Sequence, residues 1–107
     1  MRVDRKLLES ELARIVQDLK KMGARRIVLF GSLARGEPRV RSDIDLLVIF
    51  RDRDHFKSRM RKVYSEIEAE VDFDILAYNE EEFARIKDRT LFRRIEKEGK
   101  VLYAAAD

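Results

Sequence analysis

The stretch Phe30–Phe50, FGSLARGEPRVRSDIDLLVIF, combines a Gly-Ser turn with two closely spaced aspartates. The turn begins at Gly31 and Ser32, directly after one apolar run, and Asp43 and Asp45 stand where the next apolar run begins. Side chains alternate between the two faces of a strand, so both carboxylates would project to the same side. Neighbouring carboxylates repel each other and are costly to bury. We therefore expect a cation between them.

A second pair of aspartates occurs in VDFDILAY, residues 71–78, where Asp72 and Asp74 share a face by the same alternation. If this strand lies beside the one that carries Asp43 and Asp45, three carboxylates converge from two strands. Carboxylate oxygens are the ligands that Mg²⁺ and Mn²⁺ prefer, with waters and substrate phosphates completing the shell. The pattern predicts a two-metal site for phosphoryl or nucleotidyl transfer. Strand alternation alone does not choose between Asp72 and Asp74.

The sequence GSLARG, residues 31–36, offers groups that bind anions. Gly31 lets the backbone approach a phosphate closely, and Ser32 supplies an N–H and a hydroxyl. If a helix begins at Leu33, its unpaired N–H groups face the phosphates. Arg35 adds a guanidinium that is always charged. This turn is predicted to hold a triphosphate while the aspartates hold its metal ions.

The 107-residue chain is expected to form one domain, residues 1–107. Its 24 basic and 21 acidic residues leave a net charge of only +3, which tolerates a polyanionic partner without requiring one. It has no cysteine, which excludes a disulfide framework and a thiolate metal site. No apolar run approaches the roughly 20 residues of a membrane span. We expect a cytoplasmic protein with no membrane contact.

The apolar pattern predicts helices and strands in alternation. A stripe from Leu8 to Met22 predicts a helix closed by Gly23, and a second stripe from Phe56 to Ile67, including Tyr64, predicts another helix with these residues in the core. Short apolar runs predict four strands, at residues 25–30, 44–50, 71–78 and 100–104.

The helix ends carry their own signals. Asp52 or Asp54 is expected to cap the second of these helices, and Asn79 with Glu82 predicts a capping box at the start of a third helical region. A break is expected near Thr90 in that region. The order of elements predicts an α/β (α+β) fold, a small mixed β-sheet with helices packed on it.

The basic residues between positions 51 and 62 are expected on a solvated helix face. Acidic residues interrupt the run, and no aromatic residues are interleaved for base stacking. The sequence leaves nucleic acid open as an acceptor. These basic residues are Arg51, Arg53, Lys57, Arg59, Arg61 and Lys62.

GSLARGEPRVRSDIDLLV resembles the signature of the polymerase-β-type nucleotidyltransferase superfamily: Gly-Ser, a short helix with Arg-Gly, then Asp-x-Asp entering a strand. The short chain and its segment DILAYNEEEF resemble the minimal nucleotidyltransferases, which are often antitoxin partners of HEPN-domain proteins. A lone Asp-x-Asp is a weak signal, whereas the combined signals between two strands are specific. The resemblance covers residues 26–83 and implies the polymerase-beta-like nucleotidyltransferase fold.

The resemblance also implies roles for single residues. Gly31 and Ser32 would bind the nucleotide phosphates with help from Arg35, and Asp43 and Asp45 would ligate metal.

For the third catalytic and metal-binding carboxylate the resemblance favours Asp74, because the family's aspartate precedes three mostly apolar residues and a helix start. Asp72 stays the alternative. Ser42 is expected to shape the turn beside the nucleotide. Leu33 departs from the arginine or polar residue often found there, which removes a contact but no essential ligand.

The function that this resemblance implies is transfer of a nucleoside monophosphate, AMP from ATP, to a hydroxyl acceptor, with two Mg²⁺ ions and Mn²⁺ as the alternative ion. The resembling antitoxins modify a tyrosine of a HEPN toxin, so we expect a protein adenylyltransferase. The chain has no room for an added acceptor domain, and a HEPN partner or a second copy is expected to complete the site. The competing hypothesis is a catalytically silent antitoxin that neutralises its partner by complex formation.

Overall fold

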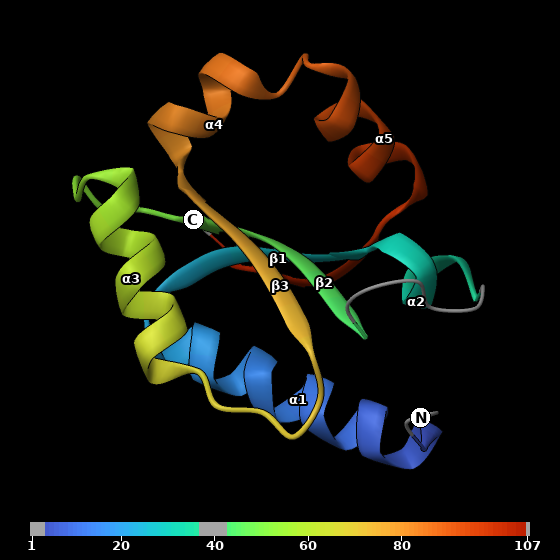
Figure 1. Cartoon of the computed structure of the whole chain (residues 1–107). Helices are drawn as coiled ribbons and strands as arrows, with labels where there is room; N and C mark the ends of the chain where they lie inside the picture. Colours follow the sequence, from blue (N-terminus) through green and yellow to red (C-terminus); the bar gives the residue numbers. More distant parts are fainter. Residues whose placement is uncertain (1–3, 37–42, 107) are drawn as a thin grey trace.

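The computed structural model describes residues 4–36 and 43–106. No helix among them is both long enough and apolar enough to cross a membrane. Helices and strands alternate along the chain, as the sequence pattern predicts (Figure 1). Their order is α1 (Arg5–Lys21), β1 (Ala24–Phe30), α2 (Gly31–Arg35), β2 (Ile44–Phe50), α3 (Phe56–Glu66), β3 (Phe73–Asn79), α4 (Glu80–Ile86), α5 (Thr90–Glu98) and β4 (Lys100–Ala104).

The strands form a single mixed sheet in the order β3-β2-β1-β4. β2 and β3 run parallel, and β1 is antiparallel to both β2 and β4. The amino ends of β2 and β3 therefore lie beside the carboxyl end of β1, where Phe30 pairs with Asp45. The predicted α/β (α+β) fold with helices on a small mixed sheet is confirmed.

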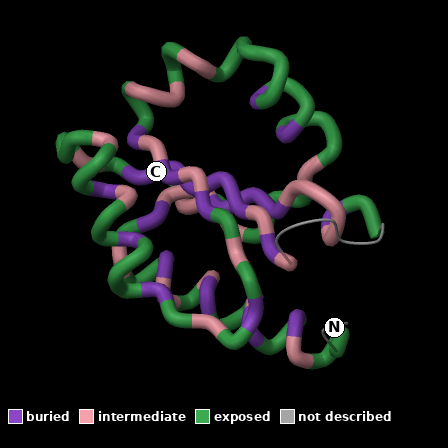
Figure 2. Tube along the Cα trace, in the orientation of Figure 1, coloured by how far each residue is buried: buried purple, intermediate pink, exposed green. Residues whose placement is uncertain are grey.

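Helices cover both faces of the sheet, with α1 and α3 on one face and α4 and α5 on the other (Figure 1). Two apolar clusters fill the layers, one built around α1 and α3 and the other around α5. The central strand β2 is buried almost from end to end, as Figure 2 shows. A strand covered on both faces has no solvent side, which explains the uninterrupted apolar run LLVIF.

The helix boundaries confirm most of the sequence signals. Asn79 and Glu82 form the predicted capping box, with each side chain accepting from the other residue's backbone N–H. The helical region is interrupted after α4, and α5 begins at Thr90, where the break was predicted. The predicted cap of α3 was wrong: the imidazole of His55 accepts from Lys57 N–H at 3.2 Å. Asp52, one of the two expected caps, is held elsewhere.

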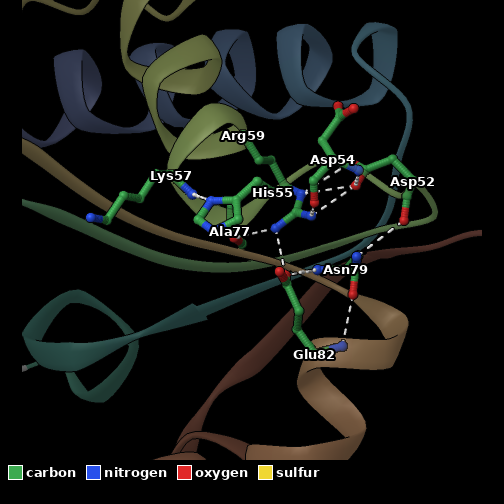
Figure 3. Close-up of polar contacts among 8 residues, drawn as sticks. All are labelled: Asp52, Asp54, His55, Lys57, Arg59, Ala77, Asn79 and Glu82. Carbon is green, nitrogen blue, oxygen red and sulfur yellow. Dashed lines mark hydrogen bonds and ion pairs between the residues drawn. The ribbon is translucent and has the colours of Figure 1, made fainter.

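The side chain that holds Asp52 is Arg59, which was expected on a solvated face but is only 3% exposed. Its guanidinium donates to Asp52 Oδ1 at 2.8 Å and to Glu82 Oε1 at 2.6 Å (Figure 3). Asn79 joins them by donating its amide to the Asp52 carbonyl oxygen at 3.1 Å. These four residues, the Arg59 cluster, tie α3 and α4 to the carboxyl ends of β2 and β3.

Candidate active site

The predicted aspartates lie at the opposite end of the β2–β3 pair, where the two strands begin. The parallel register makes Asp45 and Asp74 direct Cα partners. Residues paired in this way project to the same face. Leu47 and Leu76, two positions further along each strand, pack in the apolar cluster around α5. The carboxylates of Asp45 and Asp74 therefore project side by side on the face that α4 and α5 cover.

Asp43 and Asp72 lie just ahead of these strands and are joined by two hydrogen bonds, which use the backbone of Asp72 and both the backbone and the carboxylate of Asp43. Asp43 N–H donates to the Asp72 carbonyl oxygen at 3.0 Å. In return, Asp72 N–H donates to Asp43 Oδ2 at 3.1 Å. This reciprocal pair extends the strand pairing by one step. We call Asp43, Asp45 and Asp74 the acidic edge.

The Gly-Ser turn reaches the acidic edge from β1. Gly31 has a φ of +75°, in the left-handed region that favours glycine. A Cβ at this position would collide with the carboxylate of Asp45. Ser32 follows as the second residue of the short helix α2, and its carbonyl oxygen accepts from Gly36 N–H. The structure thus brings together the two halves of the quoted stretch, the Gly-Ser turn and the Asp-x-Asp pair.

Arg35, at the end of α2, lies against α5. Its Nη1 stands 3.8 Å from Glu98 Oε2, and both side chains are more than one third exposed. An exposed ion pair at this distance is weak. The phosphate-binding role of Arg35 stays a prediction. Ser42 belongs to residues 37–42, outside the part of the chain that the structure describes.

A small pocket opens on the α5 side of the Gly-Ser turn, with a volume of about 210 Å³. Pockets that enclose a drug-sized ligand usually measure about 300–1,000 Å³. This one can take part of a nucleotide at most. Its lining comes from the turn and from α5: Phe30, Gly31, Arg35, Leu91, Arg94, Ile95 and Glu98.

The acidic edge fits a divalent cation in the chemistry of its donors, because carboxylate oxygens come from Asp45 and Asp74 on one face of neighbouring strands and from Asp43 just ahead of β2. As the side chains stand, however, the described residues contain no group of three His, Cys, Asp or Glu side chains placed to hold one ion. Asp43 accepts the backbone N–H of Asp72, and Asp74 accepts a hydroxyl from α3. Hydrogen-bond donors of the chain itself thus already bind the carboxylates of Asp43 and Asp74.

That hydroxyl belongs to Tyr64, whose predicted place in the core was wrong. Tyr64 is 41% exposed, and its hydroxyl donates to Asp74 Oδ1 at 3.1 Å. Burial of the phenol group and the negative charges of Asp74 and Asp45 raise the pKa of Tyr64, against the lowering effect of the Ile75 backbone. The phenol therefore stays protonated near neutral pH. The position of Tyr64 on the apolar stripe predicted a core residue. Its hydroxyl, which needs a hydrogen-bond partner, was the one sequence feature that pointed to a polar contact.

Residues 10–107 match the family described as "Polymerase beta, Nucleotidyltransferase". The chain belongs to this nucleotidyltransferase family. Membership places it among transferases. A comparison with curated proteins gives no match.

Solved structures share the fold of this nucleotidyltransferase. One, from Sulfolobus solfataricus, is described as a "putative nucleotidyltransferase"; it is 23% identical with a TM-score of 0.60, over 97% of this chain and 92% of the other. A toxin-antitoxin with AMP-PNP is 24% identical with a TM-score of 0.57, over 91% and 73%. A mutant of the toxin-antitoxin MntA-HpeT is 22% identical with a TM-score of 0.56, over 97% and 75%.

Proposed function

We propose that this chain transfers a nucleoside monophosphate, AMP from ATP, to a hydroxyl acceptor and releases pyrophosphate. The observation that carries the proposal is the in-register pairing of Asp45 with Asp74. Contact between Gly31 and the Asp45 carboxylate supports it, because the predicted phosphate-binding turn then adjoins the acidic edge. Family membership supports the class of reaction. The choice of ATP draws on a structure of the same fold that is described with AMP-PNP.

The acidic edge would hold Mg²⁺, two ions in the full site, with Mn²⁺ as the alternative ion. When bound, such ions stabilise negative charge on the phosphates and lower the pKa of an attacking hydroxyl. Asp74 is the residue we assign to receive the acceptor's proton, since it stands beside Asp45 in register. Asp72 is the alternative third carboxylate.

The Gly-Ser turn would bind the triphosphate. Gly31 and Ser32 supply backbone N–H groups and a hydroxyl, which bind phosphate oxygens without needing a positive charge. Arg35 and Ser42 complete this set.

The acceptor we propose is a tyrosine of a HEPN-domain toxin, which makes this chain an antitoxin. Two structures of the same fold are described as toxin-antitoxin assemblies. A partner chain or a second copy would bring this acceptor to the acidic edge and complete the site.

The test is incubation with labelled ATP, Mg²⁺ and the protein encoded by the neighbouring gene. We expect label on a tyrosine of that partner, and no label with Asp43→Ala/Asp45→Ala. Asp88→Ala is the matched control, an exposed aspartate in the turn between α4 and α5, and should label as the wild type does. Equal labelling by the double variant and the wild type would exclude the acidic edge as the active site.

The alternative function is a silent antitoxin that neutralises a HEPN partner by binding it. One observation favours this alternative: within residues 4–36 and 43–106, no three acidic or histidine side chains stand together as metal ligands. A tight complex that carries no label, with the double variant equally able to neutralise the toxin, is the outcome that would support it. Neutralisation lost in the double variant, with the complex intact, supports the enzyme.

A further inference from the structure

Tyr64 is the one tyrosine whose hydroxyl the structure places on the acidic edge. Its ring belongs to α3 and stacks on Phe73, with 5.4 Å between ring centres and 17° between planes. Its hydroxyl accepts from Ile75 N–H at 2.7 Å and stands 3.1 Å from Asp74 Oδ1. The Ile75 carbonyl oxygen is more distant, at 3.4 Å, so the single hydroxyl proton goes to the nearer, charged acceptor.

This contact depends on the position of β3 at the edge of the sheet. β3 has β2 as its only neighbour in the sheet order, and every second N–H along an edge strand points outward. Ile75 packs with α1 and α3, whereas Asp74 projects to the other face. A side chain that binds both the Ile75 N–H and the Asp74 carboxylate must reach around the strand edge. Tyr64 has the length to do so.

The two bonds restrict the carboxylate. The Ile75 N–H fixes the hydroxyl oxygen, and the hydroxyl proton in turn fixes Asp74 Oδ1. A carboxylate has two oxygens, so the bond at Oδ1 leaves Oδ2 to meet another ligand on the Asp45 side. If Tyr64 served only to accept the Ile75 N–H, its hydroxyl proton would not need to point at Asp74.

We propose that Tyr64 is a positioning residue that orients the Asp74 carboxylate for a divalent cation at the acidic edge. The inference rests on the proposed function, which gives Asp74 its metal. Hydrogen-bond partners of metal-ligating side chains hold those ligands in the binding orientation, and their removal typically lowers metal affinity or activity by about 10- to 100-fold. Tyr64 would act on the ion through Asp74, without touching the ion itself.

The test measures Mn²⁺ binding by calorimetry, with and without a non-hydrolysable ATP analogue, alongside urea unfolding of each variant. Tyr64→Phe keeps the ring stacked on Phe73 and removes only the hydroxyl. We expect it to weaken Mn²⁺ binding by about 10-fold. Asp74→Asn should weaken binding at least as much, and adding Tyr64→Phe to it should cause no further loss. Tyr78→Phe, which removes a hydroxyl from the far end of the same strand, should bind as the wild type does.

The outcomes separate this inference from the proposed function. Wild-type affinity in Tyr64→Phe, with affinity lost in Asp74→Asn, overturns the role of Tyr64 and leaves the active site in place. An additional loss in the double variant also overturns it, because Tyr64 would then act by another route. Absence of Mn²⁺ binding by the wild type, even with nucleotide, overturns both. Urea unfolding separates weakened binding from loss of folded protein.

Discussion

The two ends of the parallel β2–β3 pair both gather acidic side chains, and they differ in what binds those side chains. At the carboxyl end, Arg59 donates to Asp52 and Glu82 from a side chain that is 3% exposed. At the amino end, Asp74 stands beside Asp45 and accepts the neutral hydroxyl of Tyr64. An arginine offsets negative charge, whereas a neutral hydroxyl only orients it.

This difference indicates two separate tasks. The Arg59 cluster contains its own cation and joins four elements, β2, α3, β3 and α4, so we expect its contacts to stabilise the fold. At the acidic edge, the carboxylates of Asp45 and Asp74 stand side by side, and like charges that close repel each other. Carboxylates held in that way are suited to a cation that arrives with a substrate. Variants of the acidic edge should therefore change transfer with little effect on folding, and variants of the Arg59 cluster should do the reverse.

The largest expected effect tests the acidic edge. Asp74→Asn should lower the transfer rate by about 10³-fold, the equivalent of the several kcal/mol that a bound metal contributes to the transition state. Folding stability should hold or rise, since the repulsion with Asp45 disappears. Transfer of label from ATP and urea unfolding measure the two quantities.

The matched variant for this test is Asp72→Asn. Asp72 contacts Asp43 through its backbone, which the substitution leaves in place. We expect transfer within a few-fold of the wild type. A large loss with Asp72→Asn and a small one with Asp74→Asn would reverse the assignment of the third carboxylate.

The next effect tests the opposite end. Arg59→Ala should lower the free energy of unfolding by about 3 kcal/mol, the lower part of the range for breaking a buried ion pair, because Asp52 and Glu82 keep some solvent contact. Arg61→Ala, an exposed arginine on the same helix, should change it by no more than about 0.5 kcal/mol. If urea unfolding shows the same loss of stability in both variants, the buried Arg59 cluster stabilises the fold no more than an exposed arginine does.

The sequence predicted the elements that local patterns control. Apolar spacing marked the helices and strands, and the capping box at Asn79 and Glu82 was visible because its two members lie three residues apart. Strand alternation predicted that Asp43 shares a face with Asp45 and Asp72 with Asp74, and that one of the second pair meets the first if the two strands are neighbours. Choosing Asp74 as its Cα partner required the β2–β3 register, which no short-range pattern contains.

The sequence could not predict side-chain contacts between residues that lie far apart along the chain. Arg59 lies four residues before the buried Val63, so it faces the core side of α3, but its partner Glu82 is 23 residues away. Arg59 binds the carboxylate of Asp52, and α3 begins at Phe56, which makes His55 its cap. Tyr64 was assigned to the core for a similar reason. Its ring follows the apolar stripe, while its hydroxyl binds an edge strand that only the fold places there.

A smaller effect tests the contact between the turn and the acidic edge. Gly31→Ala and Gly36→Ala both place a side chain at positive φ, at 75° and 71°, and each should cost about 1–2 kcal/mol of stability. Only at Gly31 would the new Cβ also collide with the Asp45 carboxylate. Transfer should therefore fall in Gly31→Ala beyond what its stability explains, and Gly36→Ala should keep its activity per folded molecule. Equal transfer per folded molecule by the two variants would show that the Gly-Ser turn takes no part in the active site.

The smallest effect concerns pH at the carboxyl end. Hydrogen bonds from Arg59 hold the pKa of Asp52 below its usual range, near 3.9 when unfolded. The folded pKa is the lower one, so this stabilisation is complete above about pH 4 and is lost as the pH falls through the folded pKa. Asp52→Asn should flatten the acid side of a plot of urea midpoint against pH.

Glu96 provides the control for that slope. Hydrogen bonds from Arg26 lower the pKa of Glu96 as well, but this pair is exposed, with side-chain exposures of 31% and 38%. Solvent screens such a pair, so Glu96→Gln should flatten the acid side less than Asp52→Asn does. If the two variants flatten it equally, burial adds nothing to the coupling between Arg59 and Asp52, and the energetic contrast between the two ends of β2 and β3 becomes smaller than their geometry indicates.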